Sequence, residues 1–433
     1  MSECREHIGT HRLLEHQVPD DVLVARAFLS RVAEPATHSL WRFVEEAGPV
    51  AAAAAVRAGS APAAVLSACA ARCADADPIA DLDIAARHDI RLVVPESLDW
   101  PHLAMGALHR LAVADVRAIA GAVDSAGVLV PPLALWVRGN AELSSLGLSS
   151  VAIVGARAAT EYGRRIAAVL SYDLATAGLG IVSGGAFGID AAAHRGALTA
   201  GGSTILVSAG GIDQPYPRAN AALFDEAAEH GLVLSESPPG SAPQRHRFLT
   251  RNRIIAALSR GVVVVEAAHR SGAANTAAHA SALGRTLMAV PGPVTSPMSA
   301  GCHALIRRQS AEATLVTCAA DVLELVGPIG ITGQCGPAET SGASGTAGLA
   351  ATGVSERSGA GVRAILDALP EPERRVFDGL PARAAARPDE IAARCGVEAA
   401  QVIRALPGLV LSGLVEEVDG RFRISRRPSQ GPP

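Results

Sequence analysis

Lysine is absent from this chain of 433 residues, and all 38 of its basic residues are arginine. A P-loop nucleotide hydrolase needs the lysine of its phosphate loop, and a Schiff-base or pyridoxal enzyme needs a lysine amine. Both classes are therefore excluded, as is any other catalytic lysine. An arginine-only sequence rich in alanine and glycine also indicates a compositional bias of the coding sequence. A single arginine is thus weak evidence for a site, whereas a cluster of arginines is stronger evidence.

Long apolar segments are missing as well. The longest alanine-rich run, Val50–Ala55, is far shorter than the ~20 apolar residues that span a bilayer. Met1–Gln17 lacks the apolar stretch of a secretory signal. The seven cysteines are scattered and odd in number, which fits a reducing compartment better than a disulfide framework. Cys69 and Cys73 lie four residues apart, but no second pair or nearby histidine completes a zinc site. We expect a cytoplasmic protein with no membrane partner, metal or cofactor.

The charge is distributed unevenly along the chain. The formal net charge is −4, and residues 1–150 carry 12 arginines against 18 acids. Residues 237–311, in contrast, carry nine arginines and a single acid, Glu266. A segment this basic within an acidic protein is typical of a site for a polyanion. The alternative is that acids are missing by chance from a stretch rich in buried strands and Gly/Pro loops.

The pattern of elements predicts an α/β fold. Residues 1–95 indicate a small helical (SAM-like) domain, with helices from Asp20 or Asp21 to Val32, over Ser39–Ala47 and over Val50–Arg57. Residues 96–326 indicate a central domain, in which short apolar runs alternate with helical stretches. Such runs indicate a doubly wound, mostly parallel sheet buried on both faces. The runs are Leu133–Arg138, Val151–Val154, Gly180–Ser183, Thr204–Val207, Leu232–Leu234, Val262–Val265 and Thr286–Val290.

The last hundred residues indicate a tethered small domain. Residues 327–368 are rich in Gly, Ala, Ser and Thr, which is typical of a flexible linker. Residues 369–425 then predict a winged-helix-like domain. Its expected elements are helices near Glu371–Gly379, Pro388–Gly396 and Glu398–Leu406, and a hairpin that joins Leu414–Val418 to Arg421–Ile424 through Asp-Gly.

Two loops after predicted strands have the composition of phosphate-binding turns. Gly155–Arg157 follows the first strand of the βα series, with Thr160 placed to cap the next helix, and the glycine-rich segment Ser183–Gly188 follows the second strand. A helix N-terminus presents unpaired N–H groups and a positive dipole end to a phosphate. Neither loop is a GxGxxG motif, so no dinucleotide cofactor is expected. We interpret Asp190 as a helix cap and His194 as a packing residue.

An arginine-rich segment follows further along the chain. Arg251 and Arg253 stand at a predicted helix start, with Phe248 nearby. Guanidinium groups clamp phosphates through two hydrogen bonds, and an aromatic ring beside them can stack a base. Because no paired histidine, nucleophilic cysteine or acid pair accompanies them, they suit binding better than hydrolysis. The remaining loops of this kind are Gly210–Asp213, Ser271–Ala273 and Val290–Pro293.

In their order and spacing these motifs resemble the DNA-processing protein A family (DprA/Smf), over about Leu133–Leu325. The resemblance implies an extended Rossmann-like domain that binds single-stranded DNA along a basic pocket and forms a homodimer. We expect this binding to be independent of sequence, and we expect a binding protein and not an enzyme. It also implies protection of incoming strands during natural transformation and loading of the RecA recombinase, the expected protein partner. The motifs that carry it are Ile153–Arg157, Ser183–His194, Tyr216-Pro217, Arg251–Ala256, Ser271-Gly272 and Ala289–Gly292.

The resemblance also assigns residues of this sequence to the nucleic-acid-binding site. Phosphate contacts are expected from Arg157, Ser183, Gly184, Arg251 and Arg253. The rest of the expected site comprises Gly210 and Gly211 in the neighbouring loop, together with Phe248, Ser271 and Gly272.

The sequence departs from the family pattern at several positions. Phe187 stands where a basic or other long residue is common, Ala274–Thr276 replaces a Leu-Ile-Thr, and His303 replaces an asparagine. The N-terminal region has Ala33–Thr37 in place of a glycine-rich hairpin, and it is acidic. We therefore expect residues 1–95 not to grip DNA. The winged-helix domain is expected to contact protein or to regulate.

Two alternatives remain open. Related Rossmann-like folds include phosphoribohydrolases, which carry a Pro-Gly-Gly-x-Gly-Thr loop followed shortly by an acid. Here Arg270–Thr276 has no acid after it, and Glu266 precedes it. The other alternative is a sensor that binds a free nucleotide and signals through the winged helix, because phosphate loops alone do not distinguish a nucleotide from a polynucleotide.

Overall fold

The structure is a computed structural model in which the chain forms two compact units, residues 1–339 and 340–433. In the first unit it describes residues 18–114, 129–269, 271–307 and 313–327. In the second unit it describes residues 376–377, 380, 385–395, 402, 405–406, 409–410, 414–418 and 421–424.

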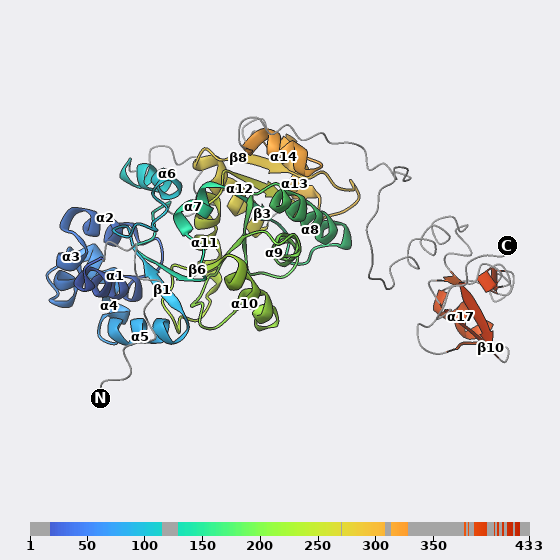
Figure 1. Ribbon diagram of the computed structural model, residues 1–433, viewed down its shortest axis with the longest axis horizontal. Coiled ribbons are helices and arrows are strands. Elements are labelled where there is room, and N and C mark those ends of the chain that lie inside the picture. Colours follow the sequence, from blue (N-terminus) through green and yellow to red (C-terminus); the bar gives the residue numbers. More distant parts are fainter. Residues whose placement is uncertain are drawn as a thin grey trace, which may run out of the picture. The chain divides into compact units, whose positions relative to one another are not determined.

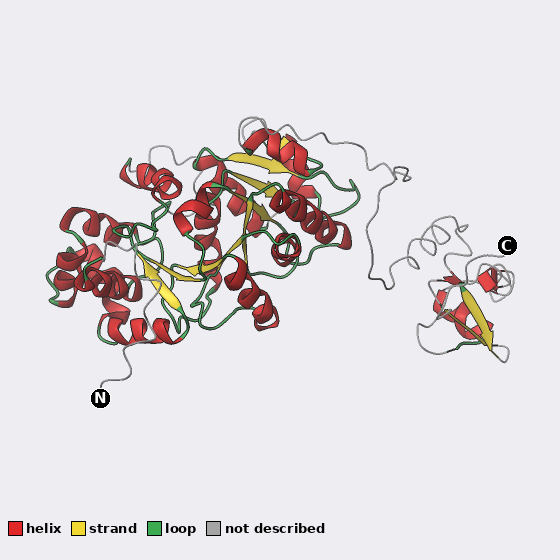
Figure 2. Cartoon of the chain, in the orientation of Figure 1, coloured by secondary structure: helices red, strands yellow, loops and turns green. Residues whose placement is uncertain are grey.

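A nine-stranded sheet runs through the first unit (Figures 1 and 2). The strand order is β1-β2-β6-β5-β4-β3-β7-β8-β9, and neighbouring strands from β6 to β9 are parallel, while β2 is antiparallel to both β1 and β6. The predicted α/β class is confirmed. The strands are β1 (Ile90–Val93), β2 (Leu135–Arg138), β3 (Ser150–Val154), β4 (Gly180–Gly184), β5 (Thr204–Val207), β6 (Leu232–Ser235), β7 (Gly261–Val264), β8 (Thr286–Ala289) and β9 (Thr314–Leu315).

Helices cover both faces of this sheet, and successive side chains of a strand pack alternately against the helices of one face and of the other. In β3, Ala152 and Val154 share a core cluster with α11 and α12, whereas Val151 and Ile153 share one with α8 and α9. Every residue of β3 is buried, which explains why its sequence is a continuous apolar run. The helices are α6 (His102–Val113), α7 (Leu143–Leu148), α8 (Glu161–Thr176), α9 (Ile189–Thr199), α10 (Ala221–His230), α11 (Arg245–Ala257), α12 (Gly272–Ala282), α13 (Ala300–Arg307) and α14 (Ala319–Val326).

The N-terminal region is helical, as predicted, and its helices lie together beside β1 (Figure 1). Phe28, Leu29 and Leu40 are almost fully buried and anchor a separate apolar core. Strand β1 lies before residue 95 but pairs with β2 in the large sheet, and the boundary at 95/96 stays a prediction. The helices are α1 (Asp20–Val32), α2 (His38–Ala47), α3 (Pro49–Arg57), α4 (Ala63–Cys73) and α5 (Pro78–Arg87).

The second unit contains two of the elements expected for its winged-helix domain. Helix α17 (Pro388–Cys395) matches the predicted helix, and β10 (Val415–Val418) pairs antiparallel with β11 (Arg421–Ile424) as the predicted hairpin. The expected linker beyond Gly327, and most of the helices expected at 371–379 and 398–406, lie outside the described residues. Among the helices described in either unit, none combines the length and apolar character needed to cross a membrane.

Candidate nucleic-acid interface

A cavity of about 620 Å³ opens where the carboxyl ends of β3 and β7 meet the loop after β4. The strand order reverses at β3, because β4, β5 and β6 lie on one side of it and β7 on the other. Open α/β sheets bind ligands in the crevice at such a reversal. The cavity is lined by Val154, Gly155, Ala156, Arg157, Ala186, Asp190, Tyr216, Pro243, Arg245, Phe248, Leu249, Arg251, Asn252, Ile255, Ser271, Gly272, Ala273 and Thr276. We call it the strand pocket.

Three arginines of the strand pocket make no ion pair with any described residue. Arg251 is only 7% exposed; its Nη1 donates to the Val207 carbonyl, and its Nε has no partner in the part of the chain that the structure describes. Arg157 and Arg245 are exposed at the mouth. Burial lowers the pKa of Arg251 to about 10, so it remains a cation at neutral pH. The pocket thus offers a buried and two exposed cations to an anion.

Two aromatic rings stand beside these arginines. Phe248 is half-buried, and its ring centroid lies 5.8 Å from that of the exposed Tyr216. The Arg157 guanidinium carbon lies 4.6 Å from the Phe248 centroid, within range of a cation–π contact. Aromatic faces stack unpaired bases with little regard to sequence. Tyr216 was not among the predicted site residues, because it stands 32 positions before Phe248 and only the fold brings the two rings together.

Helix α12 begins at the pocket with an open N-terminus. Its N-cap, Ser271, makes no side-chain capping bond, and the Ser271 Oγ is buried with no hydrogen-bonding partner among the described residues. The Asn252 side chain donates to the Gly272 carbonyl and to the Asn275 side-chain oxygen, which ties α11 to this helix start. The free N–H groups and the positive end of the helix dipole favour an anion here.

The N-terminus of α8, in contrast, is already occupied. The Glu266 carboxylate accepts from the Thr160 backbone N–H (2.9 Å) and from the Thr160 hydroxyl. Thr160 is the N-cap, as predicted, and its Oγ1 accepts from the Gly163 N–H. The expected phosphate position at this helix start is therefore wrong, because a protein carboxylate fills it. Glu266 itself is 1% exposed and does not line the pocket, so it does not supply the acid of a phosphoribohydrolase site.

The structure corrects the predicted roles of Ser183 and Arg253. Ser183 is fully buried, and its hydroxyl donates to the Ile153 carbonyl at 2.6 Å, which holds β4 to β3. Arg253 is also fully buried: its Nη2 lies 2.8 Å from the Glu236 carboxylate, and its Nε donates to the Val130 carbonyl. Neither residue lines the pocket, and neither has a free donor facing it.

The predicted glycines act by leaving space. A Cβ at Gly184 would collide with the Arg251 guanidinium, so this glycine allows Arg251 to lie against β4. Gly210 and Gly211 are buried against the 238–243 loop, which supplies Pro243 to the pocket wall. Gly272 lines the pocket itself at the start of α12.

The basic segment 237–311 is therefore largely committed to internal contacts. Arg247 and Arg253 form ion pairs, and the Arg285 guanidinium donates to two backbone carbonyls. A buried arginine requires such partners because its desolvation is costly. Arg245 and Arg251 are the members of this segment that line the strand pocket, and Arg270 and Arg308 lie outside the described residues.

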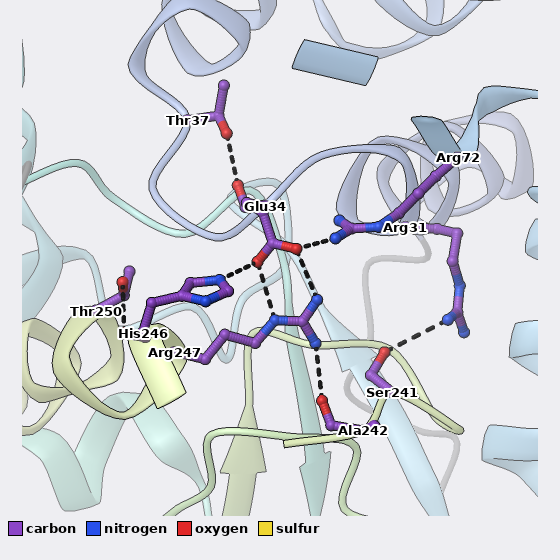
Figure 3. A network of polar contacts seen from close by, with 9 residues as sticks. All are labelled: Arg31, Glu34, Thr37, Arg72, Ser241, Ala242, His246, Arg247 and Thr250. Carbon is purple, nitrogen blue, oxygen red and sulfur yellow. Dashed lines mark hydrogen bonds and ion pairs between the residues drawn. The ribbon is translucent and has the colours of Figure 1, made fainter. Parts of the chain in front are cut away.

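One acid of the N-terminal region fixes the start of α11 (Figure 3). Glu34, just after α1, accepts from Arg247 through both Nε and Nη2, from the His246 Nε2 and from Arg72 on α4. We call this the Glu34 network. Arg31, on α1, adds contacts to the Ser241 hydroxyl and the Pro239 carbonyl. The segment that replaces the family's hairpin thus clamps the helix that carries Phe248 and Arg251, a role that the sequence did not reveal.

Asp190 is the acid that lines the pocket, and its predicted role as a cap is wrong. The N-cap of α9 is Gly188, and Asp190 lies two residues into the helix, 8% exposed. Burial raises the pKa of Asp190 to about 6, although the positive charge of Arg251 opposes the rise. His194, one turn further on, is fully buried between the Thr204 hydroxyl and the Gly184 carbonyl, as expected for packing. Burial lowers its pKa to about 4.

The departures from the family pattern fall into two groups. Asn275 and Thr276 belong to the site: the first accepts from Asn252, and the second lines the pocket. Phe187 is 49% exposed outside the lining, and His303 contacts the Gly292 carbonyl at 3.0 Å. Among the described residues, no cluster of three histidine, cysteine or acidic side chains could hold a metal ion.

Comparison with known proteins agrees with this architecture. The family described as DNA recombination-mediator protein A matches residues 125–327, and the DprA winged helix domain matches residues 357–421. A putative DNA processing protein DprA of Mycobacterium tuberculosis is 45% identical over 407 residues, 94% of this chain and 95% of that protein. DNA processing protein DprA of Streptococcus pneumoniae is 44% identical over 200 residues, 46% of this chain and 69% of that protein. The X-ray structure of the pneumococcal protein covers 71% of this chain and 98% of its own, with a TM-score of 0.55 and 30% identity.

Proposed function

Because this chain belongs to the DNA recombination-mediator protein A family, whose members are known as DNA-binding, non-enzymatic proteins, we propose that it binds single-stranded DNA in the strand pocket. The sugar-phosphate backbone contacts Arg157, Arg245 and Arg251, and one phosphate approaches the N-terminus of α12 at Ser271. A neighbouring base stacks on Phe248. Because these contacts involve charge and stacking and not base edges, binding is independent of sequence.

The observation that carries this proposal is the set of three unpaired arginines beside two aromatic rings at the sheet's carboxyl edge. Elsewhere in the segment 237–311 the structure gives Arg247 and Arg253 carboxylate partners, so the pocket arginines differ in lacking one. Stacking on Phe248 and Tyr216 requires an unpaired base. The pocket therefore suits a single strand better than a duplex, whose bases are already stacked on one another.

The finer roles rest on family membership. We propose that the protein protects incoming strands during natural transformation, helps load RecA onto them, acts in the cytoplasm and forms a homodimer. Stimulation of RecA filament formation on strands already covered by this protein tests the partner. Sedimentation at several protein concentrations tests the dimer.

Binding is tested by fluorescence anisotropy with a labelled oligo-dT of about 20 nucleotides at several salt concentrations. On a single strand, log K falls with log salt at about −0.7 per phosphate contact. The Arg251→Ala variant is expected to weaken binding for every sequence and to reduce the slope by about one contact. Arg87→Ala on α5, an exposed arginine that does not line the pocket, is the matched control and retains the wild-type slope.

Two competitors separate this function from the alternatives. A duplex that barely displaces the labelled strand supports the single-strand proposal. Efficient displacement by thymidine monophosphate would instead support a nucleotide sensor or a nucleotide enzyme. An Arg251→Ala variant with the wild-type slope would remove Arg251 from the site.

A further inference from the structure

The strand pocket holds a carboxylate that a pocket for polyanions does not need. Asp190 projects from the first turn of α9 into the lining, and it is 8% exposed. It forms no ion pair within 4.0 Å with a described residue, although two arginines of the same lining act on it electrostatically. An acid placed in this way repels any anion that enters, so its presence calls for a reason.

Three segments around Asp190 contribute groups that act on its carboxylate. Arg251 comes from α11 and Arg157 from the loop after β3, and both favour the charged carboxylate. The Ala186 backbone N–H, from the loop after β4, also favours the charged form. His194 on α9 faces Gly184 and Thr204 instead. Burial opposes all of these contacts and favours the protonated acid.

We propose that Asp190 is a specificity-determining residue of the strand pocket, where it disfavours a phosphomonoester relative to a phosphodiester, and that it takes up a proton when the strand binds. This inference rests on the proposed function. The lining carries three cations, Arg157, Arg245 and Arg251, and an ionised Asp190 offsets one of these positive charges. The carboxylate also repels a bound phosphodiester, which has a charge of −1. A terminal phosphomonoester carries a charge of about −1.5 to −2 at pH 7, so the Asp190 carboxylate repels it more strongly than it repels a diester.

The direction of the proton linkage follows from the same charges. The bound phosphate lies near Asp190, so it disfavours the ionised carboxylate and raises the pKa of Asp190 above its value of about 6 in the empty pocket. Strand affinity is then greater at low pH and falls as the pH rises through the bound-state pKa. A rise of about 1.5 pKa units on binding corresponds to affinity on the order of tenfold higher at pH 6 than at pH 8.

The first experiment measures oligo-dT binding from pH 8 to pH 6 in the full-length wild type and in Asp190→Asn. Asparagine keeps the size and the acceptor oxygen but has no charge. The wild type is expected to gain roughly tenfold in affinity over this range, and the variant is expected to bind more tightly at pH 8 and to lose most of the pH dependence. Asp173→Asn, an exposed acid on α8, is the matched control and keeps the wild-type profile. His246→Gln is a second control, because it removes the imidazole of the Glu34 network, which does not line the pocket.

The second experiment tests charge selection with two competitors, the diester d(TpT) and thymidine monophosphate. Repulsion by a carboxylate grows with ligand charge, so Asp190→Asn should raise the affinity for the monophosphate by about twice as many log units as for the diester. Equal gains, or a wild-type strand affinity that does not change with pH, would overturn the inference. Failure of the wild type to bind oligo-dT at any pH would instead overturn the proposed function. If Asp190→Asn does not fold, the wild-type pH profile alone decides.

Discussion

An alanine at position 184 is expected to expel the Arg251 guanidinium from the strand pocket. An added Cβ would lie 2.6 Å from Nη2 and 2.7 Å from Cζ of Arg251, distances that real contacts do not reach. The backbone at Gly184 is that of an ordinary strand, so alanine itself causes no conformational strain. The flexible arginine therefore has to move, and it loses its hydrogen bond to the Val207 carbonyl. Under the proposed function it also loses its contact with the DNA strand. A charged hydrogen bond contributes about 1.5–3 kcal/mol, so affinity should fall roughly 10- to 100-fold.

The assay is anisotropy of labelled oligo-dT against salt concentration, in which Gly184→Ala should also reduce the slope by about 0.7. Gly185→Ala is the matched control. An added Cβ at Gly185 would lie 2.5 Å from the Phe224 ring, on the far side of β4. The resulting overpacking should lower the free energy of unfolding by about 1–3 kcal/mol. The variant leaves Arg251 in place and should not change the slope. A Gly184→Ala protein with wild-type affinity and slope would refute the assignment of Arg251 as a strand ligand.

Four further predictions separate binding from stability. Glu34→Ala leaves a buried arginine of the Glu34 network without its acceptor and should lower the unfolding free energy by about 2 kcal/mol in urea titrations. Arg253→Ala leaves the buried Glu236 carboxylate without its ion-pair partner and should lower the free energy of unfolding by about 3–5 kcal/mol. The folded variant should keep the wild-type salt slope of oligo-dT binding. Phe248→Leu should weaken oligo-dT binding by about 1–3 kcal/mol with no change in that slope, because stacking involves no counterion. Asp190 has a raised folded-state pKa of about 6, so its contribution to stability is present below its unfolded pKa and is lost as the pH rises through 6. Unfolding at pH 7 should therefore show Asp190→Asn more stable than the wild type, with the advantage absent at pH 4.

Much of the fold could be predicted because its elements have local signals. The runs that became β3 to β8 are continuous and apolar, since both faces of those strands are buried. Thr160 was predicted as a helix cap from its place after a turn, and it is one. Strand β9, with only two residues, gave no such signal, and β1 has half-buried residues at its centre. Pairing along the sheet decided both.

The site could be predicted only as a region. The sequence by itself determined that loops at the carboxyl ends of parallel strands would converge, and that arginines, glycines and Phe248 would lie among them. It did not determine which arginines remain free. Arg247 meets Glu34 from 213 positions away, whereas Arg251, four residues further along the same helix, meets no described acid within ion-pair distance.

The same limit applies to the carboxylates of the site. Glu266 and Asp190 each stand close to a loop expected to hold a phosphate. Glu266 is buried at the start of α8, where its carboxylate accepts a hydrogen bond from Thr160. Asp190 lines the pocket together with Arg251. The physical reason is that burial and ion pairing depend on which side chains the fold brings within a few ångströms, and those partners come from distant parts of the chain. Composition and local pattern therefore set the elements and the edge of the sheet where the site forms, and the tertiary structure alone decided which charges are available there.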